Sequence, residues 1–129
     1  MATRQREKSA ARIAGRDTRP QAVARYVRVT PSKIRIILDL IRGKDYKEAE
    51  AILEYNASPA GKTILSVLKS AGANAENNLG LNKSDLFVAE TFADGGPTLK
   101  RHQPVSKGRA HAILKRTSHI TVILDVKKA

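Results

Sequence analysis

The sequence contains no cysteine and no tryptophan, and its only aromatic residues are three Tyr and two Phe. Without cysteine, neither a disulfide framework, nor a thiolate zinc site, nor a cysteine nucleophile is available. Because aromatic residues are so few, the hydrophobic core must be aliphatic. No apolar run reaches the length of about 18 residues that a membrane-spanning helix needs. The basic first residues lead into no apolar segment, so we expect no secretory signal.

Acidic residues are scarce at both ends of the chain. Lys and Arg number 24 against 12 Asp and Glu, a formal net charge of +12. The net charge is +6 over residues 1–30, +2 over 31–35 and +7 over 95–129, but −3 over 36–94. Charge of one sign at both ends indicates a polyanionic partner. We predict a flexible basic arm over residues 1–22, which orders on its partner, and a single domain over 23–129.

Three helices are predicted in the central segment. The first begins at Thr30-Pro31, with apolar residues at 34, 37, 38 and 41. The second begins at Asp45, where Glu48 completes a pair typical of a capping box. The third follows Ser58-Pro59. Its small residues at 70–75 favour a tight contact with another helix or with the sheet over a contact with nucleic acid.

Alternating apolar residues predict strands over about 24–29, 86–93 and 116–126. The segment between the last two is too long for a structureless loop in a compact domain. We infer a continuous β-hairpin over about 86–126 that turns near 104–107. Each arm would cover on the order of 60 Å, which is more than the width of a domain this small, so part of the hairpin projects. The projecting part has few supporting contacts and is therefore mobile until a partner encloses it. The prediction is an α+β fold: three helices on a small three-stranded antiparallel sheet, with a long protruding β-hairpin and a basic N-terminal arm.

Motifs of catalysis are missing from the sequence. It has no Gly-rich phosphate loop, no serine elbow and no His-Glu-x-x-His pair. His102, His111 and His119 are spaced along the chain without cysteines or nearby acidic clusters, so we expect no metal site, no cofactor and no enzymatic activity. A catalytic domain of another type would require a pocket with convergent titratable groups.

The modes of nucleic-acid binding can be ranked from the same pattern. The strands offer no aromatic stacking surface, which argues against a reader of single strands. The helices are acidic, so phosphates would repel a recognition helix. Basic residues on an arm, a first strand and a hairpin suit phosphate contacts to a folded RNA that is read by its shape. A DNA-binding architectural protein with a β-ribbon arm is the alternative.

Six segments of the chain carry a resemblance to a known family. They are RYVRVTPSK (25–33), LDLIRGK (38–44), LKSAGANAENN (68–78), GPTLKR (96–101), KGRA (107–110) and LKRTSHIT (114–121). In this order, from about residue 24 to 126, the chain resembles the bacterial-type large-subunit ribosomal protein L twenty-two family. The resemblance implies a small α+β domain on the outside of the large subunit. It also implies a long hairpin that reaches through ribosomal RNA (rRNA) and lines the nascent-peptide exit tunnel.

The resemblance and the charge pattern together give the expected site residues. Those expected to bind rRNA are Arg25, Arg28, Lys33, Arg35, Lys100, Arg101, Lys107, Arg109, Lys115, Arg116 and His119. Those expected to face the tunnel, within a hairpin tip at about 99–110, are Leu99, His102, Gln103, Pro104, Val105, Ser106 and Gly108. The tip departs from the family in two ways: residues 103–106 carry one positive charge fewer than the family's Met-Pro-Arg-Ala-like tip, and His102 replaces an apolar residue.

The resemblance also implies partners and a location. The expected partners are large-subunit rRNA, neighbouring large-subunit ribosomal proteins and the nascent peptide. Neither a membrane nor a second copy of this chain is expected as a partner. The expected location is the cytoplasmic ribosome. The Arg-rich, acid-poor segment over residues 1–22 leaves an organellar ribosome open.

Overall fold

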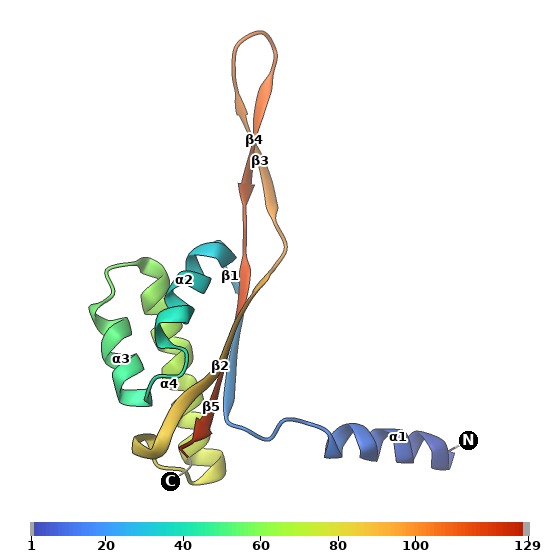
Figure 1. The fold of residues 1–129 in the computed structure, drawn as a ribbon. Coiled ribbons are helices and arrows are strands. Elements are labelled where there is room, and N and C mark those ends of the chain that lie inside the picture. The colour runs from blue at the N-terminus through green and yellow to red at the C-terminus, as the bar shows by residue number, and fades with distance from the viewer. Residues whose placement is uncertain (1, 128–129) are drawn as a thin grey trace.

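A three-stranded antiparallel sheet forms the centre of the domain in a computed structural model that describes residues 2–127. Across the sheet lie β1 (Gln21–Val27), β5 (Ser118–Val126) and β2 (Leu86–Gly95), and β5 pairs with both neighbours. Helices α2 (Pro31–Ile41), α3 (Tyr46–Tyr55) and α4 (Pro59–Leu79) lie on one side of it (Figure 1). A short 3-10 helix, η1 (Lys83–Asp85), leads into β2. The predicted α+β class is confirmed.

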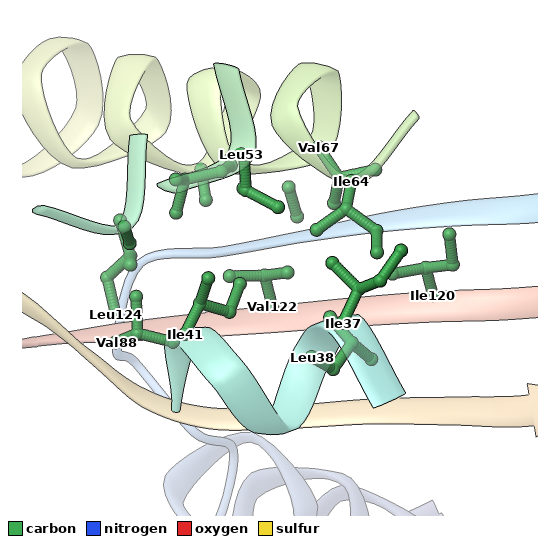
Figure 2. Packing of buried hydrophobic residues seen from close by; sticks show 14 of the residues in the cluster. Ile37, Leu38, Ile41, Leu53, Ile64, Val67, Val88, Ile120, Val122 and Leu124 are labelled. Carbon is green, nitrogen blue, oxygen red and sulfur yellow. The ribbon is translucent and has the colours of Figure 1, made fainter. Parts of the chain in front are cut away.

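The core lies between the sheet and the helices and is aliphatic, as the composition predicts. Figure 2 shows the side chains of α2, α4 and β5 pointing into one shared layer. The spacing of the α2 stripe and the alternation in β5 account for this packing, because each puts its apolar side chains on one face. The residues that carry it from these two elements are Ile34, Ile37, Leu38, Ile41, Ile120, Val122 and Leu124, all buried. Among residues 2–127, the one large aromatic residue in the core is Tyr46.

The three predicted helix caps are wrong in detail. Thr30, Asp45 and Ser58 stand at the N-caps of α2, α3 and α4, but none of their side chains accepts a hydrogen bond from its helix. The Asp45 carboxylate instead pairs with Lys127 Nζ at 2.7 Å, and Glu48 Oε1 accepts from Lys44 Nζ at 2.9 Å. Lysines therefore compete for the carboxylates that the capping box of α3 would use. All three helices still begin where the sequence predicts.

The long hairpin leaves the sheet as a separate two-stranded ribbon. Strand β2 continues into β3 (Leu99–Pro104), and β4 (Ala110–Lys115) returns into β5. At the junction, Gly96 N–H donates to Thr117 O at 2.9 Å, and Thr117 Oγ1 donates to Pro97 O at 2.6 Å. A Cβ on Gly96 would lie 2.5 Å from Thr117 Oγ1, so this crossing requires glycine. Figure 1 shows the ribbon extending well beyond the helices, as predicted.

The N-terminal arm departs from its prediction, because part of it is helical. Helix α1 (Ala2–Ala14) extends away from the domain (Figure 1), and every residue from 3 to 18 is exposed. Alanine, arginine, lysine, glutamine and glutamate all favour helix, so local propensity forms α1 without an apolar stripe. The strand after the arm also begins at Gln21, inside the segment assigned to the arm. The fold therefore has four α-helices among residues 2–127, one more than predicted.

Candidate nucleic-acid interface

The cations of the hairpin are exposed and unpaired. Lys100, Arg101, Lys107 and Arg109 lie on the projecting ribbon, and none of them forms an ion pair with a carboxylate within residues 2–127. The turn between the arms is closed by a hydrogen bond from Val105 N–H to Arg109 O at 2.9 Å. These four side chains therefore keep their full charge for an external anion.

A second group of predicted residues meets at the base of the hairpin. Arg28 follows β1, Lys33 lies in the first turn of α2, Lys115 ends β4, and Arg116 follows it. Together they line a hollow of about 460 Å³. Segments 87 residues apart thus contribute to one basic surface, which we call the basal hollow; the hydroxyl-bearing residues Thr30 and Ser58, and Val29, Pro59, Ala60 and Leu114, complete its lining.

Two helices begin at the basal hollow. Thr30 and Ser58 are the N-cap residues of α2 and α4, and a proline follows each of them. Neither hydroxyl caps its own helix. The positive ends of two helix dipoles thus reinforce the four cations, and no acidic residue lines the hollow. This arrangement suits a phosphate group. The sequence predicts these cations but not that α4 begins beside them, because that depends on tertiary packing.

Arg35 differs from the other predicted cations. Its guanidinium donates to Ala93 O through Nε at 3.0 Å and Nη2 at 2.8 Å. The side chain thereby joins α2 to the end of β2, close to where the hairpin leaves the sheet. Two of its nitrogens are committed inside the domain, which leaves Nη1 for an external contact.

Most cations of the central segment, residues 36–94, are neutralised within the domain. Lys44 donates to Glu48, Lys69 to Glu54, and Lys83 lies 2.9 Å from Glu76. Each of these contacts raises the pKa of its lysine, chiefly through the hydrogen bond to the carboxylate. The contrast with the hairpin and the basal hollow is clear, since the ten predicted Lys and Arg residues form no ion pair within residues 2–127.

The remaining predicted residues lie on the sheet and at the hairpin tip. Arg25 and His119 lie on the sheet face that α2–α4 do not cover; Arg25 is exposed, and His119 is half-buried. Of the predicted tip residues, Leu99 and Val105 are half-buried; His102, Gln103, Pro104, Ser106 and Gly108 are exposed. The tip therefore offers mostly polar groups to its surroundings.

The expectation that the strands offer no aromatic surface is wrong. Tyr26 and Phe92 are 63% and 45% exposed, and both belong to strands of the central sheet. The ring of Tyr26 meets that of His119 edge to face, with centroids 4.9 Å apart. Residues 26 and 119 are too distant in the sequence for their contact to be predicted from local patterns.

The described part of the chain holds neither a metal cluster nor a membrane-spanning helix. Within residues 2–127, no three His, Asp or Glu side chains are grouped as metal ligands. None of the helices over these residues is both long and apolar enough to cross a bilayer.

Comparison with known proteins identifies the family. The profile described as ribosomal protein L22p/L17e matches residues 22–125. The chain belongs to this family. Proteins named large ribosomal subunit protein uL22 are similar to it over most of their length. The one from Clostridium tetani is 57% identical over 108 residues, which cover 84% of this chain and 97% of the relative.

Two further relatives support the assignment. The Clostridium novyi protein is 53% identical over 104 residues, 81% of this chain and 94% of its own. The Acetivibrio thermocellus protein is 55% identical over 104 residues, 81% of this chain and 83% of its own. The L22p/L17e match includes the sheet, the helices α2–α4 and the hairpin, whereas α1 lies outside it.

Proposed function

We propose that the chain is a structural component of the large ribosomal subunit that binds large-subunit rRNA and supports subunit assembly. Membership of the L22p/L17e family and relatives named for the large subunit support this proposal. The observation that carries it is the segregation of charge. Within residues 2–127, the cations of the hairpin and the basal hollow are unpaired, whereas four of the six Lys and Arg residues at positions 36–94 form ion pairs. Phosphate contacts from such surfaces fix a protein on folded RNA without reading its sequence.

The two basic surfaces have different roles in this proposal. The basal hollow holds a phosphate of the rRNA backbone, because four cations and two helix N-termini converge there. The hairpin reaches into the RNA, and its tip lines the exit tunnel beside the nascent peptide. Neighbouring ribosomal proteins complete the surroundings. The location is the ribosome, in the cytoplasm.

Salt dependence tests the binding proposal. The full chain should bind deproteinised large-subunit rRNA with an affinity that falls roughly 10³- to 10⁵-fold between about 50 and 200 mM salt, as expected for about 6–10 phosphate contacts. A binding constant insensitive to salt would contradict the proposal. Duplex DNA serves as the competitor. If it displaces the rRNA at equal concentration, the alternative of an architectural DNA-binding protein is favoured.

A pair of matched variants tests the basal hollow. Replacing Arg28 and Arg116 by alanine should weaken rRNA binding and reduce the salt slope by about 1 for each phosphate that is no longer neutralised. The control removes the same charge from the helix side by replacing Lys44 and Lys47, which are exposed and lie outside the hollow. The control should bind like the unchanged chain. Equal effects in both variants would mean that only net charge matters.

The absence of cysteine makes the tunnel proposal testable. A single Ser106→Cys substitution introduces the only thiol, on the exposed turn of the hairpin. On ribosomes carrying a stalled nascent chain, a cross-linker on this thiol should capture the peptide. Ser84→Cys provides the control and should capture none, because Ser84 lies on η1 before β2, whereas the hairpin leaves the other end of that strand. Equal capture at both sites, or capture at neither, would contradict a tunnel-lining tip.

A further inference from the structure

Strand β1 contains an irregularity that redirects two side chains. Its pairing with β5 shifts between Ala24, opposite Ile120, and Val27, opposite Ser118, so one extra residue is inserted. Ala24 and Val27 both pack against the core, although their positions differ by an odd number. Arg25 and Tyr26 are left side by side and exposed. Bulges of this kind commonly re-aim side chains beside functional sites.

The backbone at the bulge is strained. Tyr26 has a φ of +57°, a left-handed conformation that a bulky side chain rarely adopts. The residue is also 63% exposed, so burial does not offset the strain. A glycine would relieve the backbone at this position. Strained residues of this type cluster at sites of binding and catalysis, and an exposed aromatic ring held in strain calls for such an explanation.

His119 holds the Tyr26 ring in place. The backbone N–H of Tyr26 donates to His119 Nδ1 at 3.0 Å, and the two rings meet at 89°. Because Nδ1 accepts this hydrogen bond, the ring proton of the neutral histidine is on Nε2, where it is available as a donor. The pair therefore combines a fixed aromatic ring with a hydrogen-bond donor beside it.

The surroundings match the chemistry of a nucleotide. Tyr26 and His119 line a hollow of about 420 Å³, together with the cation Arg25 and the polar side chains of Gln21, Asp94 and Thr121, and with Val23. An aromatic ring stacks on a base, an imidazole or a carboxylate hydrogen-bonds its edge, and an arginine neutralises its phosphate. The site is close to the basal hollow in the sequence. Tyr26, which lines the site, is two residues from Arg28, which lines the basal hollow.

We propose that this hollow binds one unpaired nucleotide of RNA, whose base stacks on Tyr26. The inference rests on the proposed rRNA binding and deepens it, because it adds a base contact to a surface otherwise made of phosphate contacts. The aromatic ring and the neighbouring cation favour RNA over a protein segment as the occupant. Asp94 disfavours a phosphate deep in the hollow, which orients the base inward and the phosphate toward Arg25.

Three variants of the full chain separate the ring from the fold. Tyr26→Gly removes the ring and relieves the positive φ, so it should melt at or near the temperature of the unchanged chain. Its affinity for large-subunit rRNA should fall roughly 5- to 150-fold, the loss expected for one stacked base. The salt slope should stay the same, because no charge is lost. Tyr26→Phe keeps the ring and should bind normally, as should Tyr55→Ala, which removes a tyrosine that is 92% exposed at the end of α3.

The outcomes distinguish this inference from the proposed function. If the unchanged chain binds rRNA in a salt-dependent manner but Tyr26→Gly binds equally well, the nucleotide site is wrong and rRNA binding stands. If the unchanged chain fails to bind rRNA, both proposals fall. Ultraviolet cross-linking of the unchanged complex gives an independent reading. Attachment of a base at Tyr26 or His119 supports the site, whereas cross-links from Tyr26 to a ribosomal protein in reconstituted subunits overturn it.

Discussion

Gly72 on α4 lies directly against the ring of Tyr46 on α3. A Cβ placed on Gly72 would come within 2.7 Å of both Cε2 and the hydroxyl oxygen of Tyr46. This contact accounts for Gly72 within the run of small residues at 70–75, for which the sequence favoured a tight contact with another helix or with the sheet. It also explains how the largest buried side chain fits between two helices that approach closely.

Replacing Gly72 by alanine should therefore destabilise the domain. Overpacking of this kind costs about 1–3 kcal/mol. The better helix propensity of alanine offsets about 1 kcal/mol of that loss. Urea denaturation measures the difference, and Ser70→Ala, at an exposed position of the same helix, should change the free energy of unfolding little. A Gly72→Ala variant as stable as the unchanged chain would show that the ring moves aside freely.

The burial of Tyr46 also leads us to expect that the free energy of unfolding falls in alkali. Burial, and then the carboxylate of Glu50, raise the pKa of Tyr46 above its usual 10.0. Well below pH 10.0, the ordinary pKa of tyrosine, both the folded and the unfolded chain keep the proton of Tyr46. As the pH rises further, the unfolded chain releases its proton first, so the free energy of unfolding falls. Tyr46→Phe should lose less stability between about pH 9 and pH 11 in denaturant titrations. Parallel curves for the two proteins would contradict the raised pKa.

The hairpin cations should contribute to binding and not to stability. Replacing Lys100 and Arg101 by alanine removes two exposed, unpaired charges, so the free energy of unfolding should change by no more than about 0.5 kcal/mol. The slope of rRNA affinity against salt should fall by about 2. Thermal melting and binding titrations measure the two effects. A large drop in melting temperature would mean that the ribbon is part of the core.

Helix α1 should likewise be dispensable for folding. Removing residues 3–16 deletes exposed side chains only and keeps Arg19, which pairs with Asp17 and Glu90. We expect the melting temperature to stay the same and the affinity for rRNA to fall, because the deleted segment carries a net positive charge. If the truncated chain melts several degrees lower, α1 supports the domain through contacts that its exposure does not suggest.

The parts of the fold that the sequence predicts are those governed by local patterns. The stripe of α2 and the alternation along β5 each specify one buried face, and the length between the last two strands requires a hairpin. The unpredicted parts depend on distant residues. Asp45 fails as a cap because Lys127 takes its carboxylate. Helix α1 escapes prediction for a different reason, since its residues favour helix without forming an apolar stripe.

The same division holds for the candidate interface. Its cations are predicted from charge and from the family resemblance, because charge can be counted without a structure. The convergence of two helix N-termini on the basal hollow cannot be predicted from the sequence. Nor can the pairing of Tyr26 with His119, which are 93 residues apart and meet only through the register of β1 on β5.

Hydrogen exchange along the hairpin tests most directly whether the cationic ribbon is built to be enclosed by RNA. A two-stranded ribbon with few supporting contacts is marginally stable in water. Amides of β3 and β4 should therefore exchange quickly in the free chain, while those of β5 are protected. On large-subunit rRNA, exchange in β3 and β4 should slow by about 100-fold or more. Unchanged exchange there on RNA, or protection equal to that of β5 in the free chain, would contradict the account.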